Sequence, residues 1–371
     1  MIKVLNILTD SNIGGAGRCL INYLKYCDRS QFDVKVVLPR GSLLIPEVQA
    51  LDFSVIEADH IAERSFSPEA IGSLWKLIHR EKPDIVHTHG SFSGRIAARF
   101  TGSKVIYTRH SAFPVPERLK KGPGHWLNGA VNSFFADSII AVSPATAENL
   151  TDSGVPEKKI TIMMNGVDPL RRSSEDTCHA LRSQLKIPAG VFTAGILARL
   201  EPYKGHMLLL EAAKTLKEEG RNFRFLIGGS GSAQQEIEDR IRELELEDRV
   251  LFLGFVRNVP DILSILDVQL NCSYGTEASS IALIEGMSLG LATVASDYGG
   301  NPWQVDDGVT GLLFRNLDGM DLADKLRLMM DHPETLSAMR HAALDAYNQR
   351  FTGKIFAGNI EAVYTNTINR K

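Results

Sequence analysis

The sequence has 371 residues, of which 44% are hydrophobic and 23% are charged, and its net charge is −3 at pH 7. These values describe a globular chain with room for two domains, and they argue against a nucleic-acid partner, which would call for a basic excess. The longest apolar runs, such as 191–197, are too short to cross a bilayer. The first residues lack the apolar core and cleavage site of a signal peptide, so we expect a cytoplasmic protein.

Short apolar, β-branched runs alternate with helical patterns through the first half of the chain. Continuous apolar runs are typical of parallel strands that are covered on both faces, and repeated βα units indicate a doubly wound sheet. The predicted strands are 4–8, 34–38, 54–56, 85–87, 105–107, 138–142 and 160–163. The predicted helices are 17–26, 68–79, 91–100, 126–135 and 145–152.

The same alternation restarts after a break at 165–183, which holds a glycine, a proline and a cluster of charged residues. The predicted strands are then 192–197, 224–227, 250–253, 268–271, 293–295 and 311–314, and the predicted helices are 206–218, 234–244, 279–289, 321–330 and 334–347. We predict an α/β protein with two Rossmann-like domains, 1–168 and 189–352, joined by a linker at 169–188. The segment 353–371 has apolar residues at helical spacing and is expected to pack back on the first domain.

A glycine loop follows the first predicted strand. Gly14 and Gly15 would let the backbone approach a ligand and open a helix whose N-terminus favours anions. A dinucleotide site is a competing interpretation, but the spacing is not G-x-G-x-x-G and the second strand ends without an acidic residue. A turn with a purely structural role stays open. The four cysteines lack metal-ligand spacing, and we predict no metal site: Cys19, Cys27, Cys178 and Cys272.

Two cations lie on one strand-to-helix loop of the second half. Arg199 ends a predicted strand, and Lys204 follows five residues later at the start of a helix. Two such cations repel each other unless an anion lies between them. Arginine and lysine together are suited to binding a diphosphate. The alternative is a pair of solvated loop cations.

Two glutamates stand eight positions apart near the start of another predicted helix. With Glu277 at the helix entrance and Glu285 two turns further on, the helical rise would separate them by roughly 12 Å. The N–H groups of Ser279, Ser280 and Ile281 would then point out of the helix N-terminus, where a diphosphate is favoured. The alternative is an amphipathic helix with solvated glutamates.

Taken together, these motifs resemble the retaining GT-B glycosyltransferases of family 4. Glu277 and Glu285 match the family's E-x7-E motif, and Arg199 and Lys204 match its R-x4-K motif. Further matching segments occur in the same order along nearly the whole chain: Gly14-Gly15, 84–89, 107–110, 138–143 and 165–168.

The resemblance implies a role for each matching residue. Glu285 would bind the ribose, and Glu277 would bind hydroxyls of the donor sugar. Arg199 and Lys204 would neutralise the leaving diphosphate, and His110 would lie beside the donor sugar. His89 and Asn165 would line a cleft near the acceptor, whereas His87 is expected to pack in the core. The remaining expected donor-binding residues are Gly14, Gly15, Gly229, Gly231, Phe255, Ser279, Ser280 and Ile281.

The resemblance also implies retention of anomeric configuration without a metal, and the sequence contains no D-x-D pair that would hold one. The nucleotide sugar would be a co-substrate, and no other cofactor is expected. One departure from the family is the run Ala278-Ser279-Ser280 after the first glutamate, which leaves the preferred donor sugar open.

The segment after residue 117 gives an indication of the acceptor's class. Basic residues stand beside aromatic and aliphatic ones in a way that suits an anionic membrane surface, which would favour a lipid-linked acceptor on the inner face of the membrane. The alternative is a helix that packs by its apolar side and keeps a charged rim. The residues concerned are Arg118, Lys120, Lys121, Trp126, Leu127, Phe134 and Phe135.

Two rival functions stay open. A nucleotide-sugar epimerase or a sugar phosphorylase of the same fold would share the cleft and the phosphate-binding residues. A two-domain sugar-binding protein is the alternative that is not an enzyme.

Overall fold

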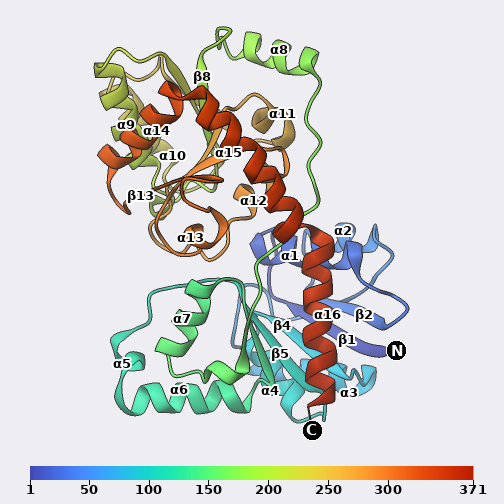
Figure 1. Cartoon of the computed structure of the whole chain (residues 1–371). Helices are drawn as coiled ribbons and strands as arrows, with labels where there is room; N and C mark the ends of the chain where they lie inside the picture. Colours follow the sequence, from blue (N-terminus) through green and yellow to red (C-terminus); the bar gives the residue numbers. More distant parts are fainter. Residues whose placement is uncertain (371) are drawn as a thin grey trace. The chain divides into compact units, whose positions relative to one another are not determined.

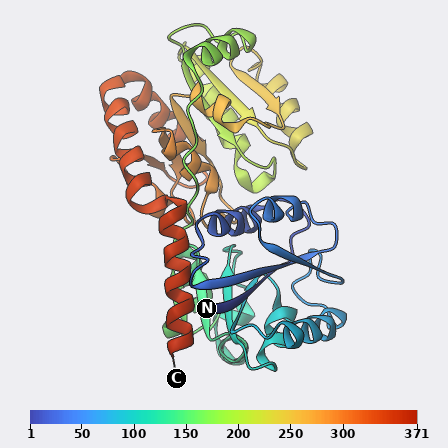
Figure 2. The same cartoon turned by 90° about the vertical axis from the view of Figure 1, so that its right-hand side faces the viewer.

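The computed structural model describes residues 1–370. The chain forms two compact units: unit 1 holds Met1–Val167 and the C-terminal residues from Phe351, and unit 2 holds Asp168–Arg350. Each unit is built on one parallel sheet with helices around it (Figures 1 and 2). This confirms the predicted fold class of two doubly wound parallel sheets. Within residues 1–370, none of the helices combines the length and apolar character that a membrane span requires.

The sheet of unit 1 has the strand order β3-β2-β1-β4-β5-β6-β7. The strands are β1 (Ile2–Leu8), β2 (Phe32–Pro39), β3 (Ser54–Ala58), β4 (Ile85–His89), β5 (Lys104–Arg109), β6 (Ser138–Ala141) and β7 (Ile160–Ile162). The helices are α1 (Gly15–Tyr26), α2 (Ile45–Gln49), α3 (Pro68–Glu81), α4 (Phe92–Arg99), α5 (Glu117–Lys120), α6 (Gly122–Phe134), α7 (Pro144–Asp152) and α16 (Gly353–Asn369). The strand order reverses between β1 and β4, which is where ligands of such sheets bind.

The sheet of unit 2 has the order β10-β9-β8-β11-β12-β13. The strands are β8 (Phe192–Leu197), β9 (Phe223–Gly228), β10 (Val250–Gly254), β11 (Val268–Asn271), β12 (Ala292–Ser296) and β13 (Gly311–Phe314). The helices are α8 (Glu175–Gln184), α9 (His206–Glu218), α10 (Gln234–Glu243), α11 (Val259–Ser264), α12 (Ile281–Ser288), α13 (Asn301–Gln304), α14 (Gly319–Asp331) and α15 (Pro333–Ala346). The reversal falls between β8 and β11.

Both faces of the central strands are buried, which explains their continuous apolar sequences. In β9, Phe225 and Ile227 belong to one hydrophobic cluster, whereas Leu226 between them belongs to another on the opposite face. Neighbouring side chains of a strand point to opposite faces, so each face carries its own layer of helices.

The C-terminal helix α16 packs on α1 in unit 1. Tyr364 is fully buried there, and its ring lies 5.9 Å from that of Tyr23 and 5.8 Å from that of Phe32. Just before α16 the chain runs beside itself, because Val167 N donates to Phe351 O at 3.0 Å and Gly353 N donates to Val167 O at 2.9 Å. The two chain crossings between the units are therefore hydrogen-bonded neighbours.

Several elements differ from the sequence-based prediction. The expected linker 169–188 contains α8, whose Leu181 packs on unit 2 and whose Arg182 donates to Ile265 O at 3.0 Å. Four shorter helices, α2, α5, α11 and α13, were not predicted because none is long enough to show a helical period. The helix expected from residue 279 begins at Ile281, since Ser280 is its N-cap.

Candidate functional site

A pocket of about 210 Å³ lies where the strand order of unit 2 reverses. The carboxyl ends of β8 and β9 form one side of it, and α11, β11 and α12 form the other. Its lining residues are Gly195, Leu197, Ala198, Arg199, Gly228, Gly229, Ser230, Phe255, Val256, Val259, Leu263, Gln269, Leu270, Ala282, Leu283 and Glu285. Most of the lining is apolar, with one cation and one carboxylate, as suits a planar ring system carrying polar groups.

Four of the residues singled out in the sequence line this pocket: Arg199, Gly229, Phe255 and Glu285. Phe255 is 71% exposed, so its ring offers a large apolar surface to a ligand. The other predicted donor-binding residues of unit 2 lie outside the lining: Lys204, Gly231, Glu277, Ser279, Ser280 and Ile281.

Close backbone packing explains two of the glycines in this region. Gly229 has φ +151°, and a Cβ there would lie 1.9 Å from Ala198 O. Gly231 has φ +159°, and its Cβ would lie 2.3 Å from Leu200 O. Both positions therefore exclude any larger residue, and they hold the loop after β9 against the loop after β8.

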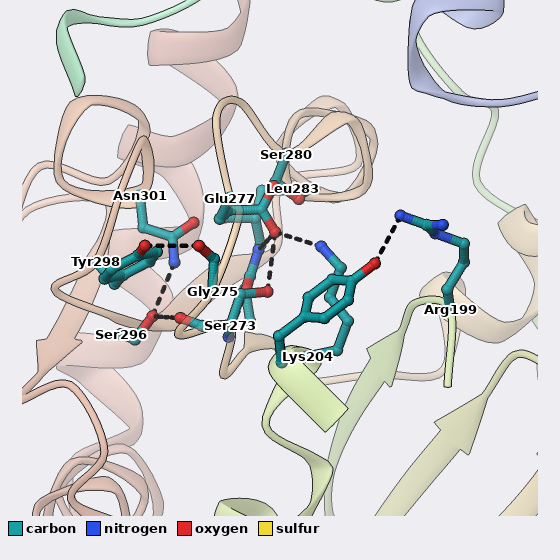
Figure 3. Close-up of polar contacts among 12 residues, drawn as sticks. Arg199, Lys204, Ser273, Gly275, Glu277, Ser280, Leu283, Ser296, Tyr298 and Asn301 are labelled. Carbon is teal, nitrogen blue, oxygen red and sulfur yellow. Dashed lines mark hydrogen bonds and ion pairs between the residues drawn. The ribbon is translucent and has the colours of Figure 1, made fainter. Parts of the chain in front are cut away.

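Next to the pocket, Glu277 is at the centre of a buried polar cluster (Figure 3). Its Oε2 accepts from Lys204 Nζ at 2.7 Å, from Ser273 Oγ at 2.9 Å and from Asn271 Nδ2 at 3.1 Å. Burial acts to raise the pKa of Glu277, but the charge of Lys204 and these hydrogen bonds outweigh it and lower the pKa below its usual value. The carboxylate is therefore ionised at neutral pH, and Oε1 accepts no hydrogen bond from a side chain of residues 1–370.

This cluster corrects the prediction that the two loop cations lack a counter-ion within the protein. The counter-ion of Lys204 is Glu277, while Arg199 donates from Nη2 to Tyr203 Oη at 3.0 Å (Figure 3). The solvated alternative does not describe Lys204, because its side chain is only 16% exposed and paired with Glu277. Arg199 is the cation that reaches the pocket.

The structure also corrects the expected N-terminus of α12. Ser280 N donates to Gln304 Oε1 at 2.7 Å, and Ser280 Oγ accepts from Leu283 N at 3.4 Å. The N–H of Ser280 therefore does not point out toward a ligand. Glu277 precedes the helix instead of standing at its entrance, so the helical rise does not set its distance from Glu285.

Residues that the sequence analysis missed hold the Glu277 loop in place. Tyr298 Oη donates to Gly275 O at 2.6 Å, Ser296 Oγ donates to Ser273 O at 2.5 Å, and Asn301 Nδ2 donates to Ser296 Oγ at 3.1 Å (Figure 3). Tyr298 and Asn301 flank Gly299-Gly300, directly after β12. A glycine pair at the carboxyl end of a predicted strand was the signal that could have drawn attention to them.

In unit 1, a row of histidines crosses the carboxyl ends of the strands next to the strand-order reversal. His89 Nδ1 lies 2.9 Å from His110 Nε2, and His89 Nε2 lies 3.2 Å from Asn6 Oδ1. Since the Asn6 oxygen is an acceptor, a neutral His89 donates to it and accepts from His110. His110 Nδ1 is then left as an acceptor.

Burial keeps these imidazoles neutral. It lowers the pKa of His110 to about 4 and that of His87 to about 3, and it holds the pKa of His89 well below its ordinary value. His87 is 1% exposed and bonds Tyr364 Oη at 2.8 Å and Thr108 Oγ1 at 2.7 Å. His87 therefore packs in the core, as expected.

The other predicted residues of unit 1 are Asn165, Gly14 and Gly15. His89 and His110 line a small cavity together with Cys19, whose Sγ donates to Asn165 Oδ1 at 3.1 Å. Gly14 is the N-cap of α1, and nothing lies within 4 Å of a Cβ built on Gly15, so the start of α1 is open to a ligand. Among residues 1–370, no group of three or more histidine, cysteine or acidic side chains could hold a metal.

Known proteins resemble the chain over nearly its full length. Residues 13–171 match the family model described as Glycosyltransferase Family 4, and residues 179–345 match the model described as Glycosyl transferases group 1. A phosphatidylinositol N-acetylglucosaminyltransferase subunit from Arabidopsis thaliana is 31% identical over 66% of this chain, but the match covers only 54% of that relative. UDP-Gal:alpha-D-GlcNAc-diphosphoundecaprenol alpha-1,3-galactosyltransferase of Escherichia coli is 28% identical over 84% of each chain.

Solved structures share the fold. A glycosyltransferase from Rickettsia africae superposes with a TM-score of 0.85 at 20% identity and covers 100% of both chains. Anabaena Alr3699/HepE in complex with UDP-glucose superposes with a TM-score of 0.83 at 23% identity, covering 99% of this chain and 100% of its own. With both sheets, the pocket at the strand-order reversal and two adjoining family models in agreement, the chain belongs to the family 4 glycosyltransferases (glycosyl transferases group 1).

Proposed function

We propose that this protein transfers a hexose from a UDP-sugar to a glycan or lipid-linked acceptor, with retention of anomeric configuration and without a metal, in the synthesis of a cell-surface polysaccharide or glycoconjugate. The observation that carries the proposal is the pocket of unit 2, where Arg199 and Glu285 line a largely apolar cavity beside the Glu277–Lys204 pair.

The pocket supports a nucleoside as its ligand. Phe255 and Val256 offer an apolar surface for a base, and Glu285 offers a carboxylate that can accept hydrogen bonds from the two ribose hydroxyls. Uracil is the proposed base because Anabaena HepE, which shares the fold, was solved with UDP and with UDP-glucose.

The diphosphate would lie between Arg199 and the start of α12. Arg199 can grip phosphate oxygens with two parallel hydrogen bonds, and the first N–H groups of α12 add donors and a partial positive charge. Lys204 has three ammonium hydrogens, of which the Glu277 bond uses one. It can therefore hold Glu277 and still donate to a phosphate oxygen.

The donor sugar would lie against Glu277. All three side-chain hydrogen bonds to this carboxylate end on Oε2, so Oε1 can accept from a sugar hydroxyl. The positions of Asn271 and Ser273 fix the carboxylate before the sugar arrives, which reduces the entropy lost on binding.

In the proposed reaction, the bond from the anomeric carbon to the phosphate oxygen breaks, and the acceptor hydroxyl forms its new bond on the same face. The acceptor's proton passes to the leaving phosphate oxygen. Arg199, Lys204 and the N-terminus of α12 stabilise the negative charge that develops on the diphosphate. His110, neutral and with Nδ1 as an acceptor, would receive a hydrogen bond from the donor sugar, while His89 and Asn165 would face the acceptor.

The acceptor is proposed from the relatives. The name of the Escherichia coli relative specifies a sugar linked to diphosphoundecaprenol, which supports a lipid-linked acceptor. We therefore infer that the protein works on the cytoplasmic side of a membrane, in peripheral contact with it.

A donor screen followed by product analysis tests the proposal. Thermal shift with UDP-, GDP- and ADP-sugars should raise the melting temperature most for a UDP-sugar, since a ligand that binds only the folded state stabilises it. Glu285→Ala should abolish this shift. The matched control is Glu236→Ala, an exposed glutamate of α10, which should leave it unchanged.

Nuclear magnetic resonance of the product, with and without acceptor, then separates the rival functions. Retained configuration in a new glycosidic bond supports transfer. Conversion of the donor sugar without acceptor would identify an epimerase. Turnover that depends on phosphate would identify a phosphorylase, and binding without turnover would identify a sugar-binding protein.

A further inference from the structure

Helix α6 of unit 1 turns its polar side toward the protein. Asn128 Nδ2 donates to Ser153 O at 2.5 Å, and His125 Nδ1 lies 3.1 Å from Leu119 O. Gly129 is buried against Gly154, where a Cβ would come within 1.9 Å of the carbonyl oxygen. The inner face of α6 is thus made of glycine, histidine and asparagine, which is the reverse of an ordinary surface helix.

The outer face of α6 is apolar and exposed. Positions 123, 126, 127, 130 and 134 fall within about 100° of one another on a helical projection. They hold Pro123, Trp126, Leu127, Ala130 and Phe134, and all five are exposed. Trp126 is 74% exposed, Leu127 58% and Phe134 49%. The sequence-based alternative of a helix packed by its apolar side is therefore wrong for these residues, although Phe135 does turn inward against Phe92.

The helix is held mainly by its other faces, although the Phe134 ring also contacts Phe135 and the guanidinium of Arg99. Arg95 is 4% exposed and donates to Asn132 Oδ1 at 3.0 Å, and its guanidinium lies 4.6 Å from the centre of the Tyr107 ring. Removing the apolar outer residues would leave these anchoring contacts in place.

Basic residues gather at the N-terminal end of α6. Helix α5 directly precedes it and carries Arg118 and Lys120, and Lys121 is the N-cap of α6 itself (Figure 1). Cations at a helix N-terminus oppose the helix dipole, so they do not serve the stability of α6. Lys120 is paired with Glu117 at 2.6 Å, while Arg118 and Lys121 are exposed.

We propose that the outer face of α6 is a membrane-binding surface that lies in the interface of an anionic bilayer, with Trp126, Leu127 and Phe134 among the acyl chains and Arg118 and Lys121 at the phosphate level. Exposed cations beside an exposed apolar stripe are complementary to lipid phosphates above acyl chains, and a second copy of the chain is an outcome that the test below separates. The inference deepens the proposed function by naming the partner of unit 1, and it does not depend on which sugar is transferred.

Vesicle co-sedimentation of the full chain tests the surface. Binding should be strong to vesicles with one-third phosphatidylglycerol and weak to pure phosphatidylcholine. Trp126→Ser with Leu127→Ser should lower the partition coefficient at least about tenfold, because both side chains are removed from the interface. Arg118→Gln with Lys121→Gln should lower it about tenfold or more on anionic vesicles only. Trp75→Ser, which removes an exposed tryptophan of α3, is the matched control and should have no effect.

Fluorescence gives an independent readout. The chain has three tryptophans, so replacing Trp75 and Trp303 by phenylalanine leaves Trp126 as the only reporter. Lipids brominated in the acyl chain should quench it if α6 enters the interface. Absence of quenching, or equal binding to neutral and anionic vesicles, would overturn the proposal. So would a change in oligomeric state on Trp126→Ser without vesicles, which would identify the face as a contact between copies.

The UDP-sugar thermal shift separates this proposal from the proposed function. The α6 variants should keep that shift in full, since α6 belongs to unit 1 and the nucleotide pocket to unit 2. Loss of vesicle binding with an intact shift would support the surface, and vesicle binding without any shift would reject only the proposed donor.

Discussion

Glu277 and Lys204 form a buried ion pair, and its net contribution to stability depends on the groups around it. Their side chains are 8% and 16% exposed, so both charges have lost most of their water. Such a pair gives little net stability compared with apolar residues, but removal of one partner leaves an uncompensated buried charge. Asn271 and Ser273 satisfy the carboxylate only in part. We infer that the pair is kept for the position of the two groups.

Lys204→Met should therefore lower the free energy of unfolding by about 3 to 5 kcal/mol at neutral pH. Because the native pKa of Glu277 is lowered, its ionisation stabilises the fold above pH 4.5, and this contribution is lost as the pH falls below that value. Without Lys204, burial raises the native pKa of Glu277, so the difference in stability from the parent protein should narrow as the pH falls through the variant's native pKa and on through that of the parent. Urea denaturation between pH 3 and 7 measures both effects.

A matched control is Lys35→Met in unit 1, which removes the partner of Glu81 from an ion pair whose lysine is 40% exposed. This variant should lower the free energy of unfolding by no more than about 1 kcal/mol. Equal losses for the two variants would show that Lys204 has no special role in holding Glu277.

At the scale of elements, α16 completes the core of unit 1. Tyr364 touches α1 and β2 through its ring and His87 through its hydroxyl, so one side chain joins the C-terminal helix to the centre of the sheet.

Tyr364→Ala should reduce the free energy of unfolding by about 3 to 5 kcal/mol, as expected for loss of a buried aromatic ring. Tyr364→Phe should cost about 1 kcal/mol, because it keeps the buried ring and removes the hydroxyl that bonds His87. Hydrogen exchange of the β1 and β4 amides would localise the loss to unit 1. Thr365→Ala, at the exposed neighbouring position, should change stability by no more than about 0.5 kcal/mol; a larger effect would mean that the face of α16 is assigned wrongly.

The elements also show what the sequence could predict. Buried parallel strands were identified because they are continuous apolar runs, and β8, β11 and β13 have the predicted bounds. The inverted helix α6 could not be oriented, since an apolar stripe looks the same whether it faces the core or the solvent. The partners of Glu277 were missed because a loop, which has no helical or strand period, brings Asn271 and Ser273 to its carboxylate, and Tyr298 bonds Gly275 of that loop from more than twenty residues away. The N-terminus of α12 was placed too early because the adjacent Ser279 and Ser280 are both suitable N-cap residues, and the structure shows that Ser280 is the one that caps Leu283 N.

At the scale of the whole molecule, unit 2 is a continuous segment of the chain and unit 1 is not. The two crossings lie side by side, with Val167 hydrogen-bonded to Phe351 and Gly353. Unit 2 is thus inserted into unit 1 at a single place, as in domains that tolerate insertion.

A protein made of residues 168–350 alone should therefore fold cooperatively and keep the UDP thermal shift, since every residue of the nucleotide pocket lies within it. Residues 1–167 alone should lack fixed tertiary structure, because Tyr23 and Phe32 lose Tyr364. Near-ultraviolet circular dichroism and thermal melting of the two fragments check this. A cooperative melt of residues 1–167 would show that α16 is dispensable.

Because the two connections between the units lie side by side, the two units should fold at different times during synthesis on the ribosome. Unit 2 can fold as soon as its own residues have emerged, whereas β1, made first, must wait for the helix that follows residue 352. For the time needed to translate the whole of unit 2, the apolar surface around Tyr23 and Phe32 has no native cover. We infer that unit 1 keeps this apolar surface exposed until α16 has emerged.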